Sequence, residues 1–218
     1  NMKGDIIVLE EHHKKAAHTI VSQIVERIKN KSTRYTISVA GESGSGKSET
    51  AMAIADELEK YGVKSVVLAQ DDYFHLPPKS NDLKRKEDPE WLGPHAEIKF
   101  DILDNNLRDA INGKDEITKP LIDYNENSVE EVKINLIGIK VVIAEGTYTS
   151  LLKNLDTRIF IARNRLETLE HRTKRNRGNE IKDLFTEQIL ITEHKIIAGH
   201  RKLADFVITK EYEVVIPE

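Results

Sequence analysis

The segment from Gly41 to Ser48 reads Gly-Glu-Ser-Gly-Ser-Gly-Lys-Ser and fits the phosphate-loop (P-loop) pattern GxxxxGK[ST]. Glycines let such a loop curve around phosphates with several N–H groups inward, and the helix that follows adds its positive end. The lysine reaches the β- and γ-phosphates, and the final hydroxyl joins a Mg²⁺ shell. The pattern predicts a nucleoside triphosphate site formed by Gly41, Ser43, Gly44, Ser45, Gly46, Lys47, Ser48 and Glu49. It also predicts a catalytic role for Lys47.

Acidic residues follow two of the predicted strands. Asp71 and Asp72 end the run Leu68-Ala69-Gln70, and Glu145 follows a run of buried type at 140–144. The carboxyl ends of parallel strands line a common crevice. A carboxylate opposite a P-loop can accept the proton of an attacking hydroxyl, so we predict Asp71 as the general base. Asp72 could share that role or, like Asp71, simply cap the turn. Glu145 is predicted to hold Mg²⁺ together with Ser48.

Two other nucleotide-binding classes are excluded by missing motifs. A regulatory GTPase needs Asp-x-x-Gly, but none of the 11 glycines has Asp three positions earlier, and the guanine-reading Asn-Lys-x-Asp is also missing. A dinucleotide-binding turn needs a third glycine, but Glu49 occupies that position. The histidines at 12, 13 and 18 are not spaced to bring two metal ligands to one helix face, and we expect them to face solvent.

The elements that must position these residues follow from hydrophobic periodicity. Strands alternate with helices, and this order predicts a three-layer P-loop α/β fold: one domain over 1–218, with a mainly parallel central sheet, a helical lid at about 163–180 and a small substrate-side hairpin. Residues 76–94 contain four of the six prolines and are predicted to form a loop. Helices are expected at about 10–30, 47–60, 98–111, 166–177 and 182–198, and strands at 35–40, 63–68, 118–124, 129–136, 140–144, 158–162 and 205–208.

Composition narrows the function classes further. The 218 residues carry 33 basic and 37 acidic side chains, a formal net charge of −4, and no cysteine. The acidic balance argues against a nucleic-acid partner, and no apolar run approaches the roughly 18 residues of a membrane span. Absence of cysteine excludes disulfides and fits a reducing compartment, so we expect a cytoplasmic protein without a membrane partner. Oligomeric state is left open, with a homo-oligomer as one alternative.

The order of these motifs resembles the uridine kinase and phosphoribulokinase family of P-loop kinases, from about residue 35 to 208. The resemblance is carried by the P-loop, Gln70-Asp71, Ala144-Glu145-Gly146, the run Lys119-Pro120-Leu121-Ile122-Asp123-Tyr124, a basic helix, and the closing Ala204-Asp205-Phe206-Val207-Ile208. It implies ATP and Mg²⁺ as cofactors and a small-molecule hydroxyl as phosphoryl acceptor. It also implies that Asp71 is the catalytic base and that Arg172 and Arg175 are catalytic lid residues, with Arg177 at the end of the lid on the nucleotide side.

The acceptor side departs from that family. Its Phe-Asp-His-Pro stretch is represented here by Trp91-Leu92-Gly93-Pro94, and the Tyr, His and Arg expected to grip a nucleoside are missing. Buried polar groups reject substrates that leave them unpaired, so their loss bears on substrate choice. We predict substrate contacts from Asp71, Tyr73, Trp91, Asp123 and Tyr124.

Three functions remain. The single best prediction is a uridine kinase-like enzyme that transfers the γ-phosphoryl group of ATP to a hydroxyl, with a nucleoside as acceptor. The second is a kinase for a sugar, a sugar phosphate or a pantothenate-like alcohol. The third, of another class, is a catalytically weak nucleotide-binding regulatory protein. Loss of turnover in an Asp71→Asn variant that still binds ATP distinguishes the enzymes from the regulator.

Overall fold

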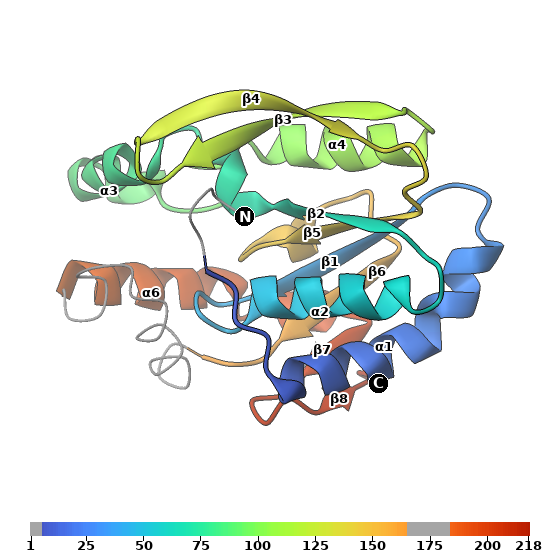
Figure 1. Ribbon diagram of the computed structural model, residues 1–218. Coiled ribbons are helices and arrows are strands. Elements are labelled where there is room, and N and C mark those ends of the chain that lie inside the picture. Colours follow the sequence, from blue (N-terminus) through green and yellow to red (C-terminus); the bar gives the residue numbers. More distant parts are fainter. Residues whose placement is uncertain (1–5, 165–183) are drawn as a thin grey trace.

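Six strands form the central sheet in the order β2-β5-β1-β6-β7-β8, and two more form a separate hairpin, β3-β4. The computed structural model describes residues 6–164 and 184–218 (Figure 1). The predicted helix at 166–177 and the lid residues Arg172, Arg175 and Arg177 lie outside the described residues. The strands of the central sheet are β1 (Tyr35–Gly41), β2 (Ser65–Ala69), β5 (Val141–Glu145), β6 (Thr157–Ile161), β7 (Phe206–Ile208) and β8 (Val214–Val215). The hairpin consists of β3 (Glu116–Asp123) and β4 (Ser128–Asn135), and the helices are α1 (Glu11–Asn30), α2 (Lys47–Glu59), α3 (Pro78–Glu87), α4 (Phe100–Ile111) and α6 (Leu184–Ile197).

The register of the sheet brings the candidate motifs to one edge. β1 pairs in parallel with β5 and β6, β2 with β5, and β6 with β7, whereas β8 runs antiparallel to β7. Glu145 at the end of β5 lies opposite Ala69 of β2 on one side and Val39 of β1 on the other. The P-loop follows β1, Asp71 follows β2 and Gly146 follows β5, so all three lie at the same edge of the sheet.

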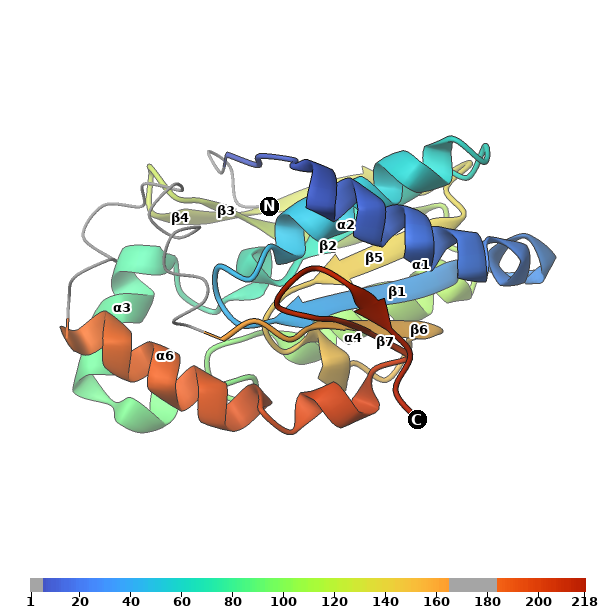
Figure 2. The same ribbon diagram turned by 90° about the horizontal axis from the view of Figure 1, so that it is seen from below.

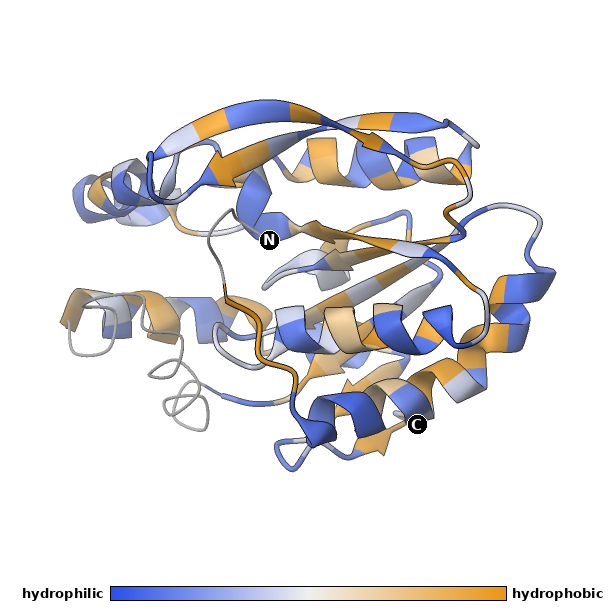
Figure 3. Cartoon of the chain, viewed as in Figure 1, coloured by the Kyte–Doolittle hydropathy of each residue, from blue (hydrophilic) through white to orange (hydrophobic). Residues whose placement is uncertain are grey.

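Helices cover both faces of this sheet, as the amphipathic patterns require. On one face α1 packs against α2 and the strands through buried side chains such as Ile20, Ile24 and Ile28 (Figure 2). On the other face Leu103 and Leu107 of α4 pack against the sheet and β3. Figure 3 shows hydrophilic and hydrophobic residues alternating along the hairpin, whose strand β4 is partly exposed. The predicted three-layer α/β fold with a mainly parallel sheet is confirmed.

Three features differ from the sequence-based expectations. Residues 78–87 form helix α3 inside the segment predicted as loop, beginning at a proline that suits the first helical turn. The short antiparallel strand β8 is an addition to the predicted elements. His13, expected to face solvent, is fully buried because its ring packs on Tyr212 near the C-terminus. Among the described residues no helix combines the length and apolar character needed to cross a bilayer.

Candidate functional site

The P-loop connects the end of β1 to the first residue of α2. Gly44 and Gly46 have φ angles of 77° and 93°, in the left-handed region where a side chain is strained. Lys47 begins α2, and its Nζ donates a hydrogen bond to the Glu42 carbonyl oxygen at 3.0 Å, across the mouth of the loop. The N-terminus of α2 contributes a partial positive charge beside this lysine. The segment has the backbone shape and the charge that a triphosphate needs.

Glu145 places a buried carboxyl group beside the P-loop. Ser48 Oγ donates to Glu145 Oε1 at 3.0 Å, and the Glu145 side chain is only 4% exposed. Burial, and then the neighbouring charge of Asp71, raise the pKa of Glu145 to about 7, although Lys47 acts in the opposite direction. A Mg²⁺ ion would relieve both unfavourable effects, and Ser48 and Glu145 are oxygen ligands of the kind it prefers.

Within residues 6–164 and 184–218 there is no group of three or more His, Cys, Asp or Glu side chains that could hold a metal ion. Mg²⁺ that is shared with a nucleotide is typically bound through one or two protein oxygens together with phosphates and water. The donor set at Ser48 and Glu145 is therefore sufficient only when a phosphate ligand shares the ion.

The ends of β2 and β5 are fastened together by Gln70. Its Oε1 accepts a hydrogen bond from the Tyr148 backbone N–H at 2.9 Å. A Cβ atom at Gly146 would lie 2.3 Å from the Gln70 Cβ, so only glycine allows this close approach. The contact fixes the short 3-10 turn Gln70–Tyr73 against the β5 loop, and so fixes the position of Asp71.

The two adjacent aspartates have separate environments. Asp72 is 1% exposed and accepts hydrogen bonds from Lys119 Nζ at 2.8 Å and from the Ile122 backbone N–H at 3.2 Å. It therefore anchors the hairpin to the end of β2. Asp71 is half-buried and lines the pocket together with Ser43 and Gly44 of the P-loop. Only Asp71 has the access that a general base needs.

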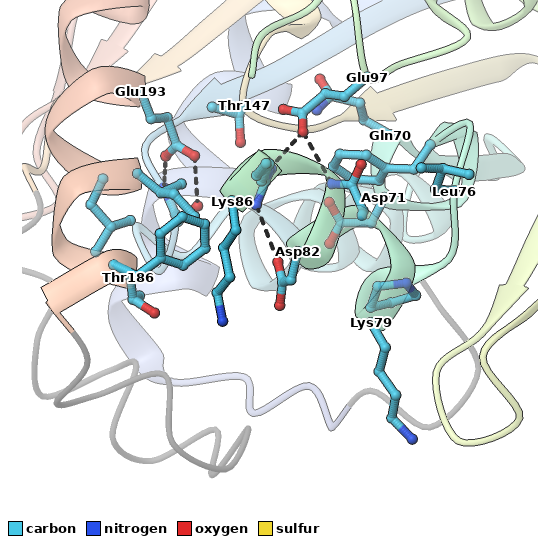
Figure 4. A pocket seen from close by; sticks show the side chains of 18 of the residues that line it. Gln70, Asp71, Leu76, Lys79, Asp82, Lys86, Glu97, Thr147, Thr186 and Glu193 are labelled. Carbon is cyan, nitrogen blue, oxygen red and sulfur yellow. Dashed lines mark hydrogen bonds and ion pairs between the residues drawn. The ribbon is translucent and has the colours of Figure 1, made fainter. Parts of the chain in front are cut away.

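A pocket of about 270 Å³ opens beside the P-loop, between α3 and α6 (Figure 4). Its lining combines carboxylates and amides with aromatic rings and with three cations. Phe74, Tyr124, Tyr148 and Phe185 supply the rings, and Lys79, Arg85 and Lys86 the cations. This mixture of planar polar groups and rings is typical of a small-molecule site.

A buried carboxylate organises the α3 wall of the pocket. Glu97, which is 0% exposed, accepts hydrogen bonds from Arg85 Nε at 2.7 Å and Asn81 Nδ2 at 3.1 Å through Oε2. Its Oε1 accepts from the Gly93 backbone N–H at 3.2 Å. Trp91 Nε1 donates to Asn81 Oδ1 at 2.8 Å. The charge of Arg85 is thus balanced by a fixed partner, and both Arg85 and Asn81 are held in place at the cavity.

Helix α6 contacts the variable residues of the P-loop. Glu193 accepts from the Ser43 backbone N–H at 2.8 Å and from Ser43 Oγ at 3.1 Å. The next residue, His194, pairs with the Glu42 carboxylate. Burial raises the pKa of Glu193, while Lys47 and the Ser43 hydrogen bonds act in the opposite direction. The α6 wall of the pocket is therefore hydrogen-bonded directly to the P-loop.

The structure brings part of the predicted site together. Ser43, Gly44, Asp71 and Tyr124 line one pocket, and Ser48 and Glu145 are in contact beside it. Three predicted substrate contacts do not line it. Tyr73 is fully buried and accepts a hydrogen bond from Asn106, Asp123 accepts from backbone N–H groups of the hairpin turn, and Trp91 lies behind Asn81.

Sequence reasoning misses the α3 wall and Glu193. Arg85 lies in the segment 76–94 that the sequence predicts as a loop, but it belongs to α3 and is a largely buried ion-pair partner of Glu97, twelve positions away. Glu193 lies 150 residues from Ser43. No local spacing marks either pair, because both depend on how α3 and α6 dock.

A P-loop that shares a pocket with a strand-end carboxylate, on a mainly parallel α/β sheet, is the arrangement expected of small-molecule P-loop kinases. The profile of the Phosphoribulokinase / Uridine kinase family matches residues 36–210. The chain belongs to this family, and it is a kinase that acts on a small molecule.

Known relatives differ in substrate. The chain is 31% identical over 196 residues to the bifunctional alpha-galactosidase/sucrose kinase AgaSK of Mediterraneibacter gnavus, covering 85% of this chain but only 21% of that enzyme. It is 26% identical over 182 residues to a uridine kinase of Staphylococcus epidermidis, covering 79% and 86% of the two chains. The D-glycerate 3-kinase structure from Cryptococcus neoformans is similar in fold, with a TM-score of 0.59, 16% identity and coverage of 96% and 99%.

Proposed function

We propose that this protein transfers the γ-phosphoryl group of ATP to a hydroxyl of a neutral carbohydrate. The observation that carries the proposal is the pocket that joins Asp71 to Ser43 and Gly44 of the P-loop. A base on one wall and a phosphate site on the other can hold an acceptor hydroxyl in line with the phosphoryl group. A carboxylate that faces the phosphate site across one pocket also argues against a purely regulatory nucleotide-binding protein.

The chain's own residues have distinct tasks in this reaction. The P-loop amides and Lys47 bind the phosphates, and Ser48 and Glu145 hold Mg²⁺. When bound, Mg²⁺ supplies positive charge that offsets the charge of the transferring group. Asp71 accepts the proton of the acceptor hydroxyl as the oxygen of that hydroxyl bonds to phosphorus. A cation bound beside Glu145 would favour its ionised form.

The charges of the pocket favour a neutral acceptor. Arg85 is 16% exposed, and its charge is already matched by Glu97. The remaining cations of the described pocket are the ammonium groups of Lys79 and Lys86 on α3, which are carried by long side chains with several rotatable bonds. An anionic acceptor such as a sugar phosphate would need a fixed and uncompensated cation, usually a bidentate arginine.

The polar groups of the pocket suit a polyol. Asp82 and Asn81 precede Arg85 on α3 by three and four positions, so each shares a helix face with Arg85, and this polar side of the pocket can pair with neighbouring hydroxyls. Tyr124 and Phe74 supply rings on which a sugar face can pack. The 31% identity to AgaSK, whose name includes a sucrose kinase activity, supports a carbohydrate acceptor.

A nucleoside is the second candidate acceptor. The uridine kinase of Staphylococcus epidermidis and its relatives support it, at identities of 22–30%. The residues that the family uses to grip a nucleoside are replaced here, since Trp91-Leu92-Gly93-Pro94 lacks the Asp and the His. We therefore place carbohydrates first.

The test is ADP release from ATP and Mg²⁺ with a panel of acceptors: neutral mono- and disaccharides, sugar phosphates, nucleosides, glycerate and pantothenate. We expect one neutral sugar to stimulate release well above the acceptor-free rate. Asp71→Asn should lose this stimulation by about 10²-fold or more while still binding ATP. Asp101→Asn, on the exposed side of α4, is the matched control and should behave like the wild type.

The outcomes separate the candidates. Stimulation by a nucleoside alone would replace the carbohydrate proposal with the nucleoside one. Stimulation by a sugar phosphate alone would refute the argument from Arg85 and Glu97. Stimulation that Asp71→Asn leaves intact would refute the assignment of the base.

A further inference from the structure

The P-loop is also held by residues that do not line the pocket. They come from the start of α1, from the residues after β6, and from the turn between β7 and β8. Tyr212 is at the centre: its ring lies edge-on to His13 at 5.1 Å between centroids, and the Arg163 guanidinium lies 5.1 Å above it. Both α1 and Tyr212 lie outside residues 36–210, the part that matches the family. The P-loop is thus supported by residues beyond the part of the chain that the family profile matches.

The central contact is a hydrogen bond to the loop backbone. Tyr212 Oη donates to the Ser45 carbonyl oxygen at 2.7 Å, and Arg163 Nη1 donates to Tyr212 Oη at 3.3 Å. The hydroxyl proton is directed at the Ser45 carbonyl, which can only accept, and the hydroxyl oxygen accepts from the arginine. Tyr212 is 8% exposed, and burial raises the pKa of its hydroxyl, so it stays protonated.

This bond sets the orientation of a phosphate-binding amide. The Ser45 C=O and the Gly46 N–H belong to one trans peptide and point in opposite directions. With the carbonyl held against Tyr212, the Gly46 N–H must face away from Tyr212. The approach is so close that a Cβ at Gly46 would lie 2.1 Å from Tyr212 Oη.

The backbone conformation of the β7–β8 turn determines where the Tyr212 side chain lies. Its φ of 63° is unusual for an aromatic residue, and such strain persists where the surroundings over-determine it. Its N–H donates to the Thr209 carbonyl at 2.9 Å, and the Thr209 N–H donates to the Glu213 carbonyl at 2.8 Å. A tight turn between β7 and β8 thus aims the side chain at the P-loop.

We propose that Tyr212 is a positioning residue that preorganises the P-loop for the phosphates of the nucleotide. The proposal rests on the proposed use of ATP. It assigns to the β7–β8 turn a role in nucleotide affinity, separate from the acceptor pocket. Loss of the hydroxyl removes one neutral hydrogen bond to the loop and leaves the ring in place.

Tyr212→Phe tests this role through nucleotide binding measured by calorimetry, with no acceptor present. We expect the Kd of Mg-ADP and the KM of ATP to rise roughly 3- to 10-fold, the usual effect of one neutral hydrogen bond. Because the base and the acceptor wall are untouched, kcat and the acceptor KM should stay within about twofold. Tyr61→Phe, at the exposed end of α2, is the matched control and should leave all four values unchanged.

A second variant, Gly46→Ala, tests whether Tyr212 and Gly46 act on nucleotide affinity through the same peptide. Gly46→Ala should weaken nucleotide binding because its Cβ meets Tyr212 Oη and its φ is 93°. If both residues act on one peptide, the double variant loses less affinity than the product of the two single losses. Losses that multiply, or a Tyr212→Phe Kd equal to that of the wild type, would overturn the positioning role. A wild-type protein that binds no nucleotide would instead refute the proposed function.

Discussion

Glu145→Gln should stabilise the nucleotide-free protein at alkaline pH while abolishing its activity. The Glu145 carboxylate is buried and faces Asp71, and its pKa rises from 4.5 to about 7. Glutamine has nearly the same shape, keeps an oxygen for the Ser48 hydroxyl and carries no charge. The substitution therefore isolates the free energy stored in one buried negative charge.

The magnitude follows from the raised pKa of Glu145. A tenfold change in proton affinity corresponds to about 1.4 kcal/mol, so a rise of the pKa from 4.5 to about 7 amounts to about 3 kcal/mol at most. The folded protein binds the proton more tightly than the unfolded chain does. Its contribution to stability is therefore fully present below pH 4.5 and is lost as the pH rises through about 7. Glutamine has no such loss, so its advantage should be absent below pH 4.5, small at pH 5 and nearly complete by pH 8.

The assay is thermal unfolding of both proteins at pH 5, 6.5 and 8 without nucleotide or Mg²⁺. For a chain of this size about 3 kcal/mol corresponds to a rise of about 5–10 °C in Tm at pH 8. Glu97→Gln is the matched control, because it changes another buried glutamate. Glu97 is paired with Arg85, so its variant should be less stable at both ends of the pH range. An equal Tm difference at pH 5 and pH 8 for Glu145→Gln would refute the reasoning.

Two further perturbations test the assignment of the pocket walls. Lys119→Met leaves the Asp72 carboxylate buried without its ion-pair partner, and we expect a loss of about 3 kcal/mol or more in urea unfolding. In the control variant Lys133→Met the lost partner is Glu116 at the surface, so the free energy of unfolding should change much less. Arg85→Lys keeps the charge but loses the planar fork, so the KM of the acceptor should rise about 10-fold while the KM of ATP stays constant in initial-rate assays; equal increases of both would contradict an acceptor-side role.

Much of the fold followed from local patterns. The helix predicted at 47–60 is found at Lys47–Glu59, and the strand predicted at 140–144 at Val141–Glu145. These elements have strong periodicity or continuous apolar runs, and they are joined by a motif whose position in a fold is narrowly constrained. The P-loop and the strand-end carboxylates come from the same local signals, so their placement was predictable while their chemical roles stay predictions.

Helix α3 was missed for a physical reason. Its sequence, Pro-Lys-Ser-Asn-Asp-Leu-Lys-Arg-Lys-Glu, has one large apolar residue, Leu83, and that residue is 62% exposed. The helix is held by polar contacts from Asn81 and Arg85 to the buried Glu97, not by an apolar stripe. Periodicity detects burial of apolar side chains and cannot detect a helix whose inner face is an ion pair.

The two aspartates after β2 show where local reasoning ends. Asp71 and Asp72 are equivalent by type and by position, yet the 3-10 turn points their side chains to different sides. Asp72 accepts hydrogen bonds from Lys119 Nζ and the Ile122 N–H, so it determines the position of the hairpin relative to β2. That position also fixes Tyr124, which follows β3 directly and lines the pocket with Asp71. The structural aspartate thus places one wall of the site in which its neighbour is proposed to act, and a defect at Asp72 should alter the acceptor KM and stability together.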